Sequence, residues 1–249
     1  MIRTLVLTAV ALLAGSLHLP HLAKAADQPA NVPDIERIVR DYLMREPEII
    51  YQAIQELQRR QQAAEAARAQ AAIAERSDEL FRHSDDPAAG AESGDVVLVE
   101  FFDYHCGYCR SMVNNLRGLV DGDPQLRFVF KELPVLGPDS VTAAKASLAA
   151  SRLDESKYYD FHVALMQSKD IGLETVLKIA AANGYDPDAI RAGMDAPWIQ
   201  ERLDANQALA ESLGISGTPS FVMGKTLIPG AVDVARLAQL VEDERKASN

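Results

Sequence analysis

Two short runs of strand-forming residues flank a helical pattern in the middle of the chain. The first run is VVLVEFFDY (residues 96–104), and the second is LRFVFKELP (126–134), which Pro134 ends. Between them, CRSMVNNLRGLVDG (109–122) places apolar residues at helical spacing. Strand, helix and strand in this order predict a βαβ unit, with a right-handed crossover and parallel strands.

Helical patterns then fill the segment from about residue 139 to 213, and two more strands follow it. SFVMG and KTLIPG predict a hairpin around Gly224, and VDVARLAQLVEDERK predicts a last helix. We therefore predict an α/β protein. Its βαβ start and ββα end are separated by an inserted helical subdomain at about 139–213.

The region before the first strand is helical throughout. Apolar residues recur at helical spacing at Ile35, Ile38, Val39, Tyr42 and Leu43. Asp34 is placed as their N-cap, and Pro47 suits the first turn of a second helix. Residues 58–82 are alanine-rich, and they form either a solvated helix or one that packs on another subunit. The turn-rich SDDPAAGAESGD (84–95) predicts a boundary between residues 26–83 and a domain of residues 84–249.

The first 25 residues have the layout of a secretory signal peptide. Arg3 precedes an apolar run from Leu5 to about Leu17, and small residues at Ala23 and Ala25 suit cleavage after Ala25. The run is shorter than the roughly 20 residues that a membrane-spanning helix needs. We expect an exported protein, with an uncleaved N-terminal anchor as the alternative.

The charge balance is acidic. The 249 residues carry 25 Lys and Arg against 36 Asp and Glu, a formal charge of -11. Removal of residues 1–25 takes away Arg3 and Lys24, so the charge becomes -11 - 2 = -13. Such a chain is a poor partner for nucleic acid.

Cys106 and Cys109 are the only cysteines of the chain. A C-x-x-C beside a βαβ pattern is typical of a thioredoxin-like redox motif, whereas zinc sites usually have a second ligand pair. His105 is adjacent, but no fourth ligand is near, so we predict no metal and keep zinc or copper binding as the alternative. A disulfide that closes so small a loop would stabilise the fold little, so the pair is predicted to be chemical.

The place of Cys106 between the first strand and its helix favours that chemistry. Unpaired N–H groups of the first helical turn and the positive end of the helix dipole stabilise a thiolate. A thiolate attacks a substrate disulfide. Cys109, one turn deeper, is then the buried thiol that releases the mixed disulfide.

The stretch VEFFDYHCGYC, the stretch GTPSFVMG (217–224) and the helical insertion between them resemble the DsbA-like thioredoxin-fold oxidoreductases of the periplasm. This resemblance covers residues of about 90 to 245. The segment YLMREPEIIYQAIQELQRRQ is similar to the N-terminal helical oligomerisation region of the suppressor-of-copper-sensitivity protein ScsC and its Com1-like relatives. Together they imply a thioredoxin fold, a periplasmic location, and a redox-active Cys106–Cys109 disulfide in place of any cofactor.

The resemblance also assigns roles around the two cysteines. Thr218 and Pro219 match a threonine and a cis-proline that face the cysteines, with an ordinary trans proline as the alternative. Glu100 matches an acid beneath the cysteines that exchanges a proton through water, with Lys131 as a candidate charge partner. The alternative for Glu100 is a carboxylate that faces solvent. Two weaker candidates for tuning the thiolate electrostatically are Asp103 and His105.

The direction of exchange is suggested by the same resemblance. Gly107 and Tyr108 match the dipeptide of the isomerase DsbC, and Thr218 also resembles the isomerases. We expect isomerisation or reduction on unfolded or wrongly bridged exported proteins, with a membrane redox partner. Isomerisation would be helped by an oligomer whose catalytic domains share one cavity. Relatives with such N-terminal helices form trimers or dimers, so a trimer is predicted. The alternatives are a monomeric disulfide-donating oxidase and a scaffold that binds copper or unfolded chains.

Overall fold

The computed structural model describes residues 31–248, so the predicted signal peptide lies outside the described residues. The chain divides into two compact units after Gln55. Among the described helices, none combines the length and the apolar content needed to cross a bilayer.

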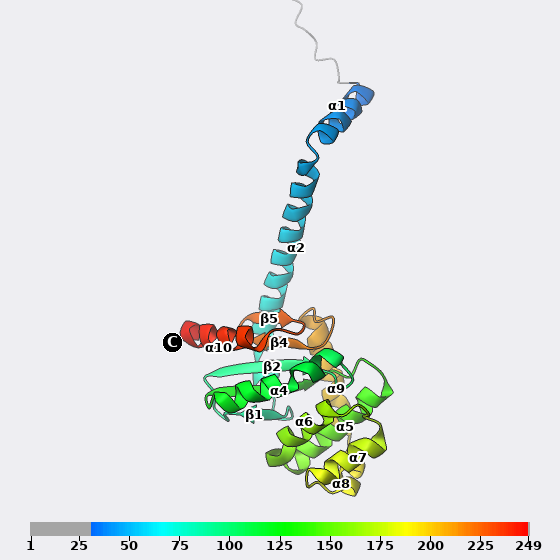
Figure 1. Cartoon of the computed structure of the whole chain (residues 1–249), viewed down its shortest axis with the longest axis vertical. Helices are drawn as coiled ribbons and strands as arrows, with labels where there is room; N and C mark the ends of the chain where they lie inside the picture. The colour runs from blue at the N-terminus through cyan, green and yellow to red at the C-terminus, as the bar shows by residue number, and fades with distance from the viewer. Residues whose placement is uncertain (1–30, 249) are drawn as a thin grey trace, which may run out of the picture. The chain divides into compact units, whose positions relative to one another are not determined.

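A five-stranded sheet forms the centre of the larger unit, with the strand order β1-β3-β2-β4-β5 (Figure 1). Its strands are β1 (Ala88–Gly90), β2 (Val96–Phe102), β3 (Leu126–Glu132), β4 (Ser220–Met223) and β5 (Thr226–Pro229). β2 and β3 run parallel and are connected by α4 (Gly107–Gly122), which confirms the predicted βαβ unit. β4 and β5 form the predicted antiparallel hairpin, which turns at Gly224 with a φ of 54°.

β1 is a strand that the sequence did not predict. It pairs antiparallel with β3 inside the segment 84–95, which has the composition of a linker. Alanine and glycine have low strand propensity, so the pairing comes from the neighbouring β3 and not from the local sequence. At Gly90, φ is 78° and a Cβ atom would lie 2.3 Å from the Leu126 carbonyl oxygen, so only glycine fits.

Alternation along the strands gives the sheet two different faces. The face that we call the catalytic face packs with α4, α6 and α10, and its core includes Leu98, Phe102, Phe128 and Phe130. The opposite face, which we call the rear face, packs with residues from α2, α3 and α9, and its core includes Val99, Phe101 and Val129. Both faces are apolar, which explains why β2 and β3 are nearly continuous hydrophobic runs.

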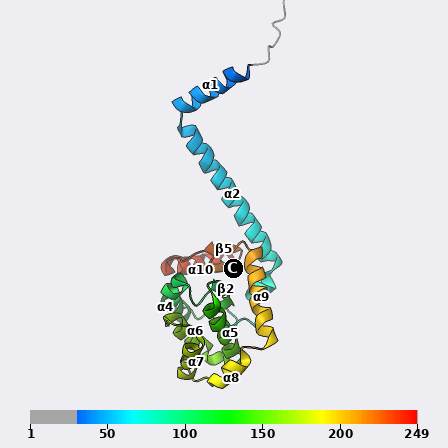
Figure 2. The same ribbon diagram turned by 90° about the vertical axis from the view of Figure 1, so that its right-hand side faces the viewer.

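The predicted helical insertion is present between β3 and β4. It consists of α5 (Pro138–Leu153), the 3-10 helix η1 (Glu155–Lys157), α6 (Tyr158–Gln167), α7 (Leu173–Ala182), α8 (Pro187–Gly193) and α9 (Pro197–Ser212). Figure 2 shows α5 to α8 gathered at one end of the sheet, while α9 runs from that end back along the sheet. The chain then forms the hairpin and closes with α10 (Val234–Ser248).

α1 (Val32–Arg45) begins before the predicted N-cap. Asn31 is the N-cap residue and Asp34 lies in the first turn, because Pro33 is readily accommodated at the start of a helix. α1 has no buried residue within the described chain, and Ile38 is 63% exposed. α2 (Glu48–Glu75) follows Pro47 as expected.

The end of α2 and the short α3 (Ser77–Phe81) contribute to the rear face. Ile73 and Leu80 are 1% and 0% exposed there, in the same cluster as Phe101. The alanine-rich segment therefore has a partner inside its own chain, which the sequence did not identify because its apolar stripe is sparse. Ile73 and Leu80, which pack on the sheet, are thus on the N-terminal side of the domain boundary predicted near residue 84.

Candidate functional site

Cys106 and Cys109 lie where β2 ends and α4 begins. Cys106 is the N-cap residue of α4, with an extended backbone (φ -70°, ψ 115°), and Cys109 lies in the first turn. The Cys106 N–H donates to the Asp103 carbonyl oxygen at 3.0 Å, which fixes the loop between strand and helix. Cys106 is 6% exposed and Cys109 is 1% exposed. The thiol nearer to solvent is thus also the one at the positive end of the helix dipole.

Thr218 and Pro219 lie against Cys106, although they come more than a hundred residues later. The Thr218–Pro219 peptide bond is cis, as predicted, and the Thr218 carbonyl oxygen accepts a hydrogen bond from Cys106 Sγ at 3.2 Å. A groove of about 400 Å³ opens beside them, which we call the proline groove. Its lining includes Tyr108, which is 70% exposed. A chain that reaches Cys106 therefore meets Thr218, Pro219 and Tyr108.

Glu100 lies on β2 beneath the cysteines. It is 1% exposed, which excludes a carboxylate that faces solvent, and its Oε1 atom has no hydrogen-bond partner in residues 31–248. Burial, and then the charge of Cys106, raise the pKa of Glu100 to about 8. Burial, and then the charge of Glu100, raise the pKa of Cys109 far above that of a free thiol. A carboxyl that titrates near neutral pH is thus next to a thiol that resists ionisation, so it is suited to accept that proton.

A small hollow beneath Cys109, too narrow to hold a water molecule, also involves the helical insertion, which the sequence did not connect with the site. Its lining includes Glu100, Cys109, Tyr159 and His162. Burial lowers the pKa of His162 to about 3, and its Nδ1 lies 3.0 Å from the Tyr104 hydroxyl. A neutral polar ring therefore packs under the thiols. The sequence carried one indication, since His162 shares a helix face with Tyr158 and Leu165 at spacings of four and three residues.

Asp103 is a buried hydrogen-bond acceptor that holds the loop after β2. Its carboxylate accepts from the N–H groups of His105 (2.7 Å), Val135 (2.8 Å) and Leu136 (3.0 Å) and from the Ser140 hydroxyl (2.7 Å). These bonds fasten the loop that carries Cys106 to the start of the helical insertion, which is a positioning role. His105 itself is exposed. The predicted electrostatic effect of Asp103 and His105 on the thiolate stays a prediction.

Lys131 does not lie beside Glu100. In the parallel register, Lys131 is opposite Phe101, whereas Glu100 is opposite Phe130. Neighbouring residues of a strand face opposite sides of a sheet, so Lys131 belongs to the rear face and Glu100 to the catalytic face. The predicted Glu100–Lys131 charge pair is therefore wrong. In the paired strands, Glu100 and Lys131 are offset by one residue, and this offset places them on opposite faces.

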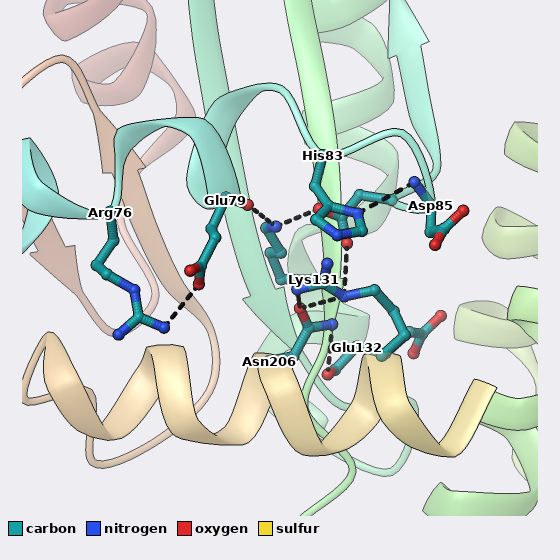
Figure 3. Close-up of polar contacts among 9 residues, drawn as sticks. Arg76, Glu79, His83, Asp85, Lys131, Glu132 and Asn206 are labelled. Atoms are coloured by element: carbon teal, nitrogen blue, oxygen red, sulfur yellow. Dashed lines mark hydrogen bonds and ion pairs between the residues drawn. The ribbon is translucent and has the colours of Figure 1, made fainter. Parts of the chain in front are cut away.

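Lys131 instead belongs to a buried ion cluster on the rear face (Figure 3). Its Nζ atom pairs with the Asp86 carboxylate and also donates to the Glu79 carbonyl oxygen. Arg202 Nε lies 3.4 Å from Asp86 Oδ1, within ion-pair range but without hydrogen-bond geometry, and Arg202 Nη2 donates to Asn206 Oδ1 at 2.9 Å. The cluster ties α3, β3 and α9 together.

Lys131→Met should destabilise the fold and leave the thiol chemistry unchanged. The substitution leaves the buried Asp86 with a reduced set of partners, which costs about 3 to 5 kcal/mol of unfolding free energy. The measurement is urea unfolding, together with the pH profile of thiol exchange, and Lys178→Met at an exposed helix position is the control. A shifted pH profile with unchanged stability would contradict the separation of the two faces.

The site offers few ligands to a metal ion. In the part of the chain that the structure describes, no group of three or more His, Cys, Asp or Glu side chains is placed to hold one. The site offers two thiols one helical turn apart, and such a pair is a ligand set for Cu(I) and not for a four-coordinate zinc ion.

Two sequence families match along the chain. Residues 97–242 match the family described as DSBA-like thioredoxin domain. Residues 34–64 match the family described as Copper resistance protein ScsC N-terminal domain. The first match spans more than half of the chain and includes both cysteines and Pro219.

Solved structures match the chain over different shares of its length. A thioredoxin-like oxidoreductase from Silicibacter pomeroyi is 42% identical, with a TM-score of 0.65, and the match covers 68% of this chain and 97% of that one. A linker-deletion mutant of ScsC from Proteus mirabilis is 28% identical, with a TM-score of 0.69 and coverage of 90% and 100%. A periplasmic thioredoxin-like protein from Salmonella enterica serovar Typhimurium is 29% identical, with a TM-score of 0.62 and coverage of 68% and 95%.

Curated relatives match this chain over different shares of their length. The Na(+)/H(+) antiporter NhaA of Herminiimonas arsenicoxydans is 28% identical over 66% of this chain, but the chain spans only 26% of the antiporter. Disulfide bond formation protein D of Bacillus subtilis is 22% identical over 64% of this chain and 77% of its own length. The matched part is in each case smaller than the whole relative. From the family match over the sheet, the cysteines and the cis-proline, the chain belongs to the DSBA-like thioredoxin family and carries an ScsC N-terminal domain before it.

Proposed function

We propose that this protein carries out thiol–disulfide exchange on exported proteins in the periplasm. The observation that supports this most is the place of Cys106 at the start of α4, with its Sγ 3.2 Å from the Thr218 carbonyl oxygen and Cys109 buried one turn on. The predicted signal peptide and the periplasmic Salmonella relative support the location.

The proposed exchange has two steps. The Cys106 thiolate attacks one sulfur of a substrate disulfide, so a new S–S bond joins Cys106 to the substrate and the other substrate sulfur leaves as a thiolate. Cys109 then transfers its proton to Glu100 and attacks Cys106 Sγ. This closes the Cys106–Cys109 disulfide and releases the reduced substrate. A membrane redox partner would return two electrons to the pair.

We also propose that the protein works as an isomerase or reductase, and not as an oxidase. The sequence pair Gly107 and Tyr108 and the threonine before the cis-proline support this direction. In isomerisation the released substrate thiolate attacks a second disulfide of the same substrate, and the thiolate freed there attacks the mixed disulfide, so Cys106 leaves as a thiolate and no net electrons are consumed. The activity requires that Cys106 is kept reduced.

Scrambled ribonuclease provides the test of direction. The protein should restore ribonuclease activity, and acid-quenched alkylation should find Cys106 and Cys109 mainly as thiols in the exported protein. Cys106→Ala is the control, because it removes the attacking sulfur. A protein isolated as the disulfide, which oxidises reduced ribonuclease but does not repair the scrambled form, would overturn the isomerase proposal in favour of an oxidase.

We propose that α1 and the start of α2 assemble copies of the chain, with three as the expected number. The match to the ScsC N-terminal domain covers this region. α1 also has one apolar side whose residues are exposed in the single chain: Ile35, Ile38, Val39 and Tyr42. Each isolated exposed apolar residue is ordinary, but four at helical spacing on one side form a continuous stripe.

Ile38→Glu should dissociate the proposed oligomer. A carboxylate within a packed apolar stripe would lose its hydration, so assembly should weaken by roughly a hundredfold. The measurement is molar mass by light scattering at several concentrations, and Arg40→Glu on the polar side of α1 is the control. A monomeric wild type, or equal masses for Ile38→Glu and the wild type, would contradict this assembly.

Copper binding is the second candidate function, because the matched N-terminal family is described as a copper resistance protein. The Cys106 and Cys109 thiols would be the ligands. Copper content after reduction and anaerobic loading tests it, with the Cys106→Ala variant beside the wild type. One Cu(I) per chain that is lost in the variant would support copper binding, and equal content in both would count against it.

A further inference from the structure

The proline groove does not end at Pro219. A second groove, of about 620 Å³, adjoins it and is lined by the second half of α2, the end of α9 with the loop that follows it, and β5. Four residues line both grooves: Gly214, Ser216, Leu227 and Pro229. The two hollows are therefore one continuous surface, which we call the extended groove. It begins at Tyr108 and Pro219 and ends on α2.

One wall of the extended groove is a sheet edge. β5 pairs with β4 and is the last strand in the order of the sheet. In residues 31–248, its outer backbone groups have no neighbouring strand. Such an edge can form backbone hydrogen bonds with an added extended chain. The residues of this wall that line the groove are Lys225, Thr226, Leu227 and Pro229.

The other wall is one side of α2, where the small Ala66 and Ala69 lie among longer polar side chains. Gln62, Glu65, Ala66 and Ala69 recur at helical spacing and all line the groove. Ala66 is exposed and Ala69 is buried, so the side changes from open to packed along the helix. Alanine side chains leave room for a chain to lie against the helix.

The extended groove has open space beside two of its glycines, and the charges of the second groove's lining balance. A Cβ atom built on Gly214 or Gly217 would meet no atom within 4 Å. The charged side chains of the second groove are two acids and two bases: Glu65, Glu211, Arg68 and Lys225. A lining with no net charge does not select a charged ligand. Together with the sheet edge, it favours recognition of a polypeptide backbone, whatever its side chains are.

We propose that α2 forms part of the client-binding site, so that an unfolded exported chain whose cysteine lies at Cys106 continues between α2 and the edge of β5. This rests on the proposed function, because the client reaches the groove through the cysteine chemistry. Continuity with the proline groove identifies the occupant, since any client held at Pro219 already lies at the mouth of the extended groove. The N-terminal region thus contributes to substrate binding as well as to assembly.

Peptides of two lengths test this proposal. The probes are a short peptide of about four residues and a long one of about twelve, which can extend roughly 40 Å, each with one cysteine in a mixed disulfide with glutathione. In the wild type, kcat/KM should be higher for the long peptide. Ala66→Trp should lower the ratio of long to short by roughly fivefold to tenfold and leave the short peptide unaffected. Lys225→Trp, from the opposite wall, should do the same.

Ala67→Trp is the matched control, because Ala67 is on the same helix, is also exposed, and does not line the groove. If Ala66→Trp does not lower the ratio relative to Ala67→Trp, the proposal is overturned. If the wild type exchanges with both peptides equally, only the α2 extension fails. If the wild type exchanges with neither, the proposed thiol–disulfide function fails as well.

Discussion

Replacement of Cys109 with alanine should trap client proteins on Cys106 as stable mixed disulfides. The first exchange step needs only Cys106, whereas release of the client in reduced form needs a second thiol of the protein, and the chain has no cysteine besides Cys106 and Cys109. Cys109 follows Cys106 by one helical turn, so it attacks as an intramolecular nucleophile. In Cys109→Ala, millimolar external thiol must do the work of Cys109, so release should slow by at least about a hundredfold. Acid-quenched, non-reducing gels with mass spectrometry would identify the trapped clients.

Cys106→Ala is the control for this trap, and it should give no adducts. Cys109 remains in that variant, but it is 1% exposed, and burial raises the pKa of its thiol. A thiol that is both covered and protonated attacks slowly. Equal amounts of adduct on Cys106→Ala and Cys109→Ala would contradict the assigned order of attack.

The parts of this site that the sequence predicts are those that local patterns specify. A β-rich run followed by an amphipathic helix fixes a strand-to-helix turn, and the two cysteines fall at that turn whatever the rest of the chain does. The same local pattern predicts the helical insertion and the hairpin at Gly224. The cis bond at Pro219 was expected from the family resemblance and not from the local residues, since a proline before a strand is usually trans.

The features that the sequence missed depend on contacts between distant segments. Lys131 and Glu100 come from two strands whose offset is set by the whole sheet, and an offset of one residue exchanges the faces. His162 reaches the hollow beneath Cys109 only because α6 packs on the catalytic face. Ile73 is one apolar residue in an alanine-rich helix, so its burial on the rear face had no periodic signal. Such tertiary choices lie outside what propensity and spacing specify.

Glu100→Gln should stabilise the folded protein at alkaline pH while it slows the release step. In the folded protein the pKa of Glu100 rises from its ordinary 4.5 to about 8. Between these values the folded state holds a proton that the unfolded chain has lost, so the free energy of unfolding falls as pH rises through this window. This pKa difference contributes about 3 to 5 kcal/mol to the free energy of unfolding at low pH, and the contribution is fully lost above a pH of about 8. Glutamine does not ionise, so in Glu100→Gln the free energy of unfolding lacks this fall with rising pH.

Urea unfolding of the reduced protein from pH 4 to pH 9 would measure this effect. The gap between Glu100→Gln and the wild type should widen with pH, whereas a constant offset would report only the exchange of one side chain for another. Glu92→Gln, at an exposed position, should follow the wild type at every pH. Parallel curves for Glu100→Gln and the wild type would contradict the raised pKa. The titratable groups that interact electrostatically with Glu100 are Cys106, Cys109, Glu132 and Tyr159, while His162, whose pKa burial lowers to about 3, stays neutral. The variant should also lose the base that accepts the Cys109 proton, so greater stability and slower client release should appear in the same protein. A carboxyl that destabilises the fold is thus retained where it is needed for proton transfer.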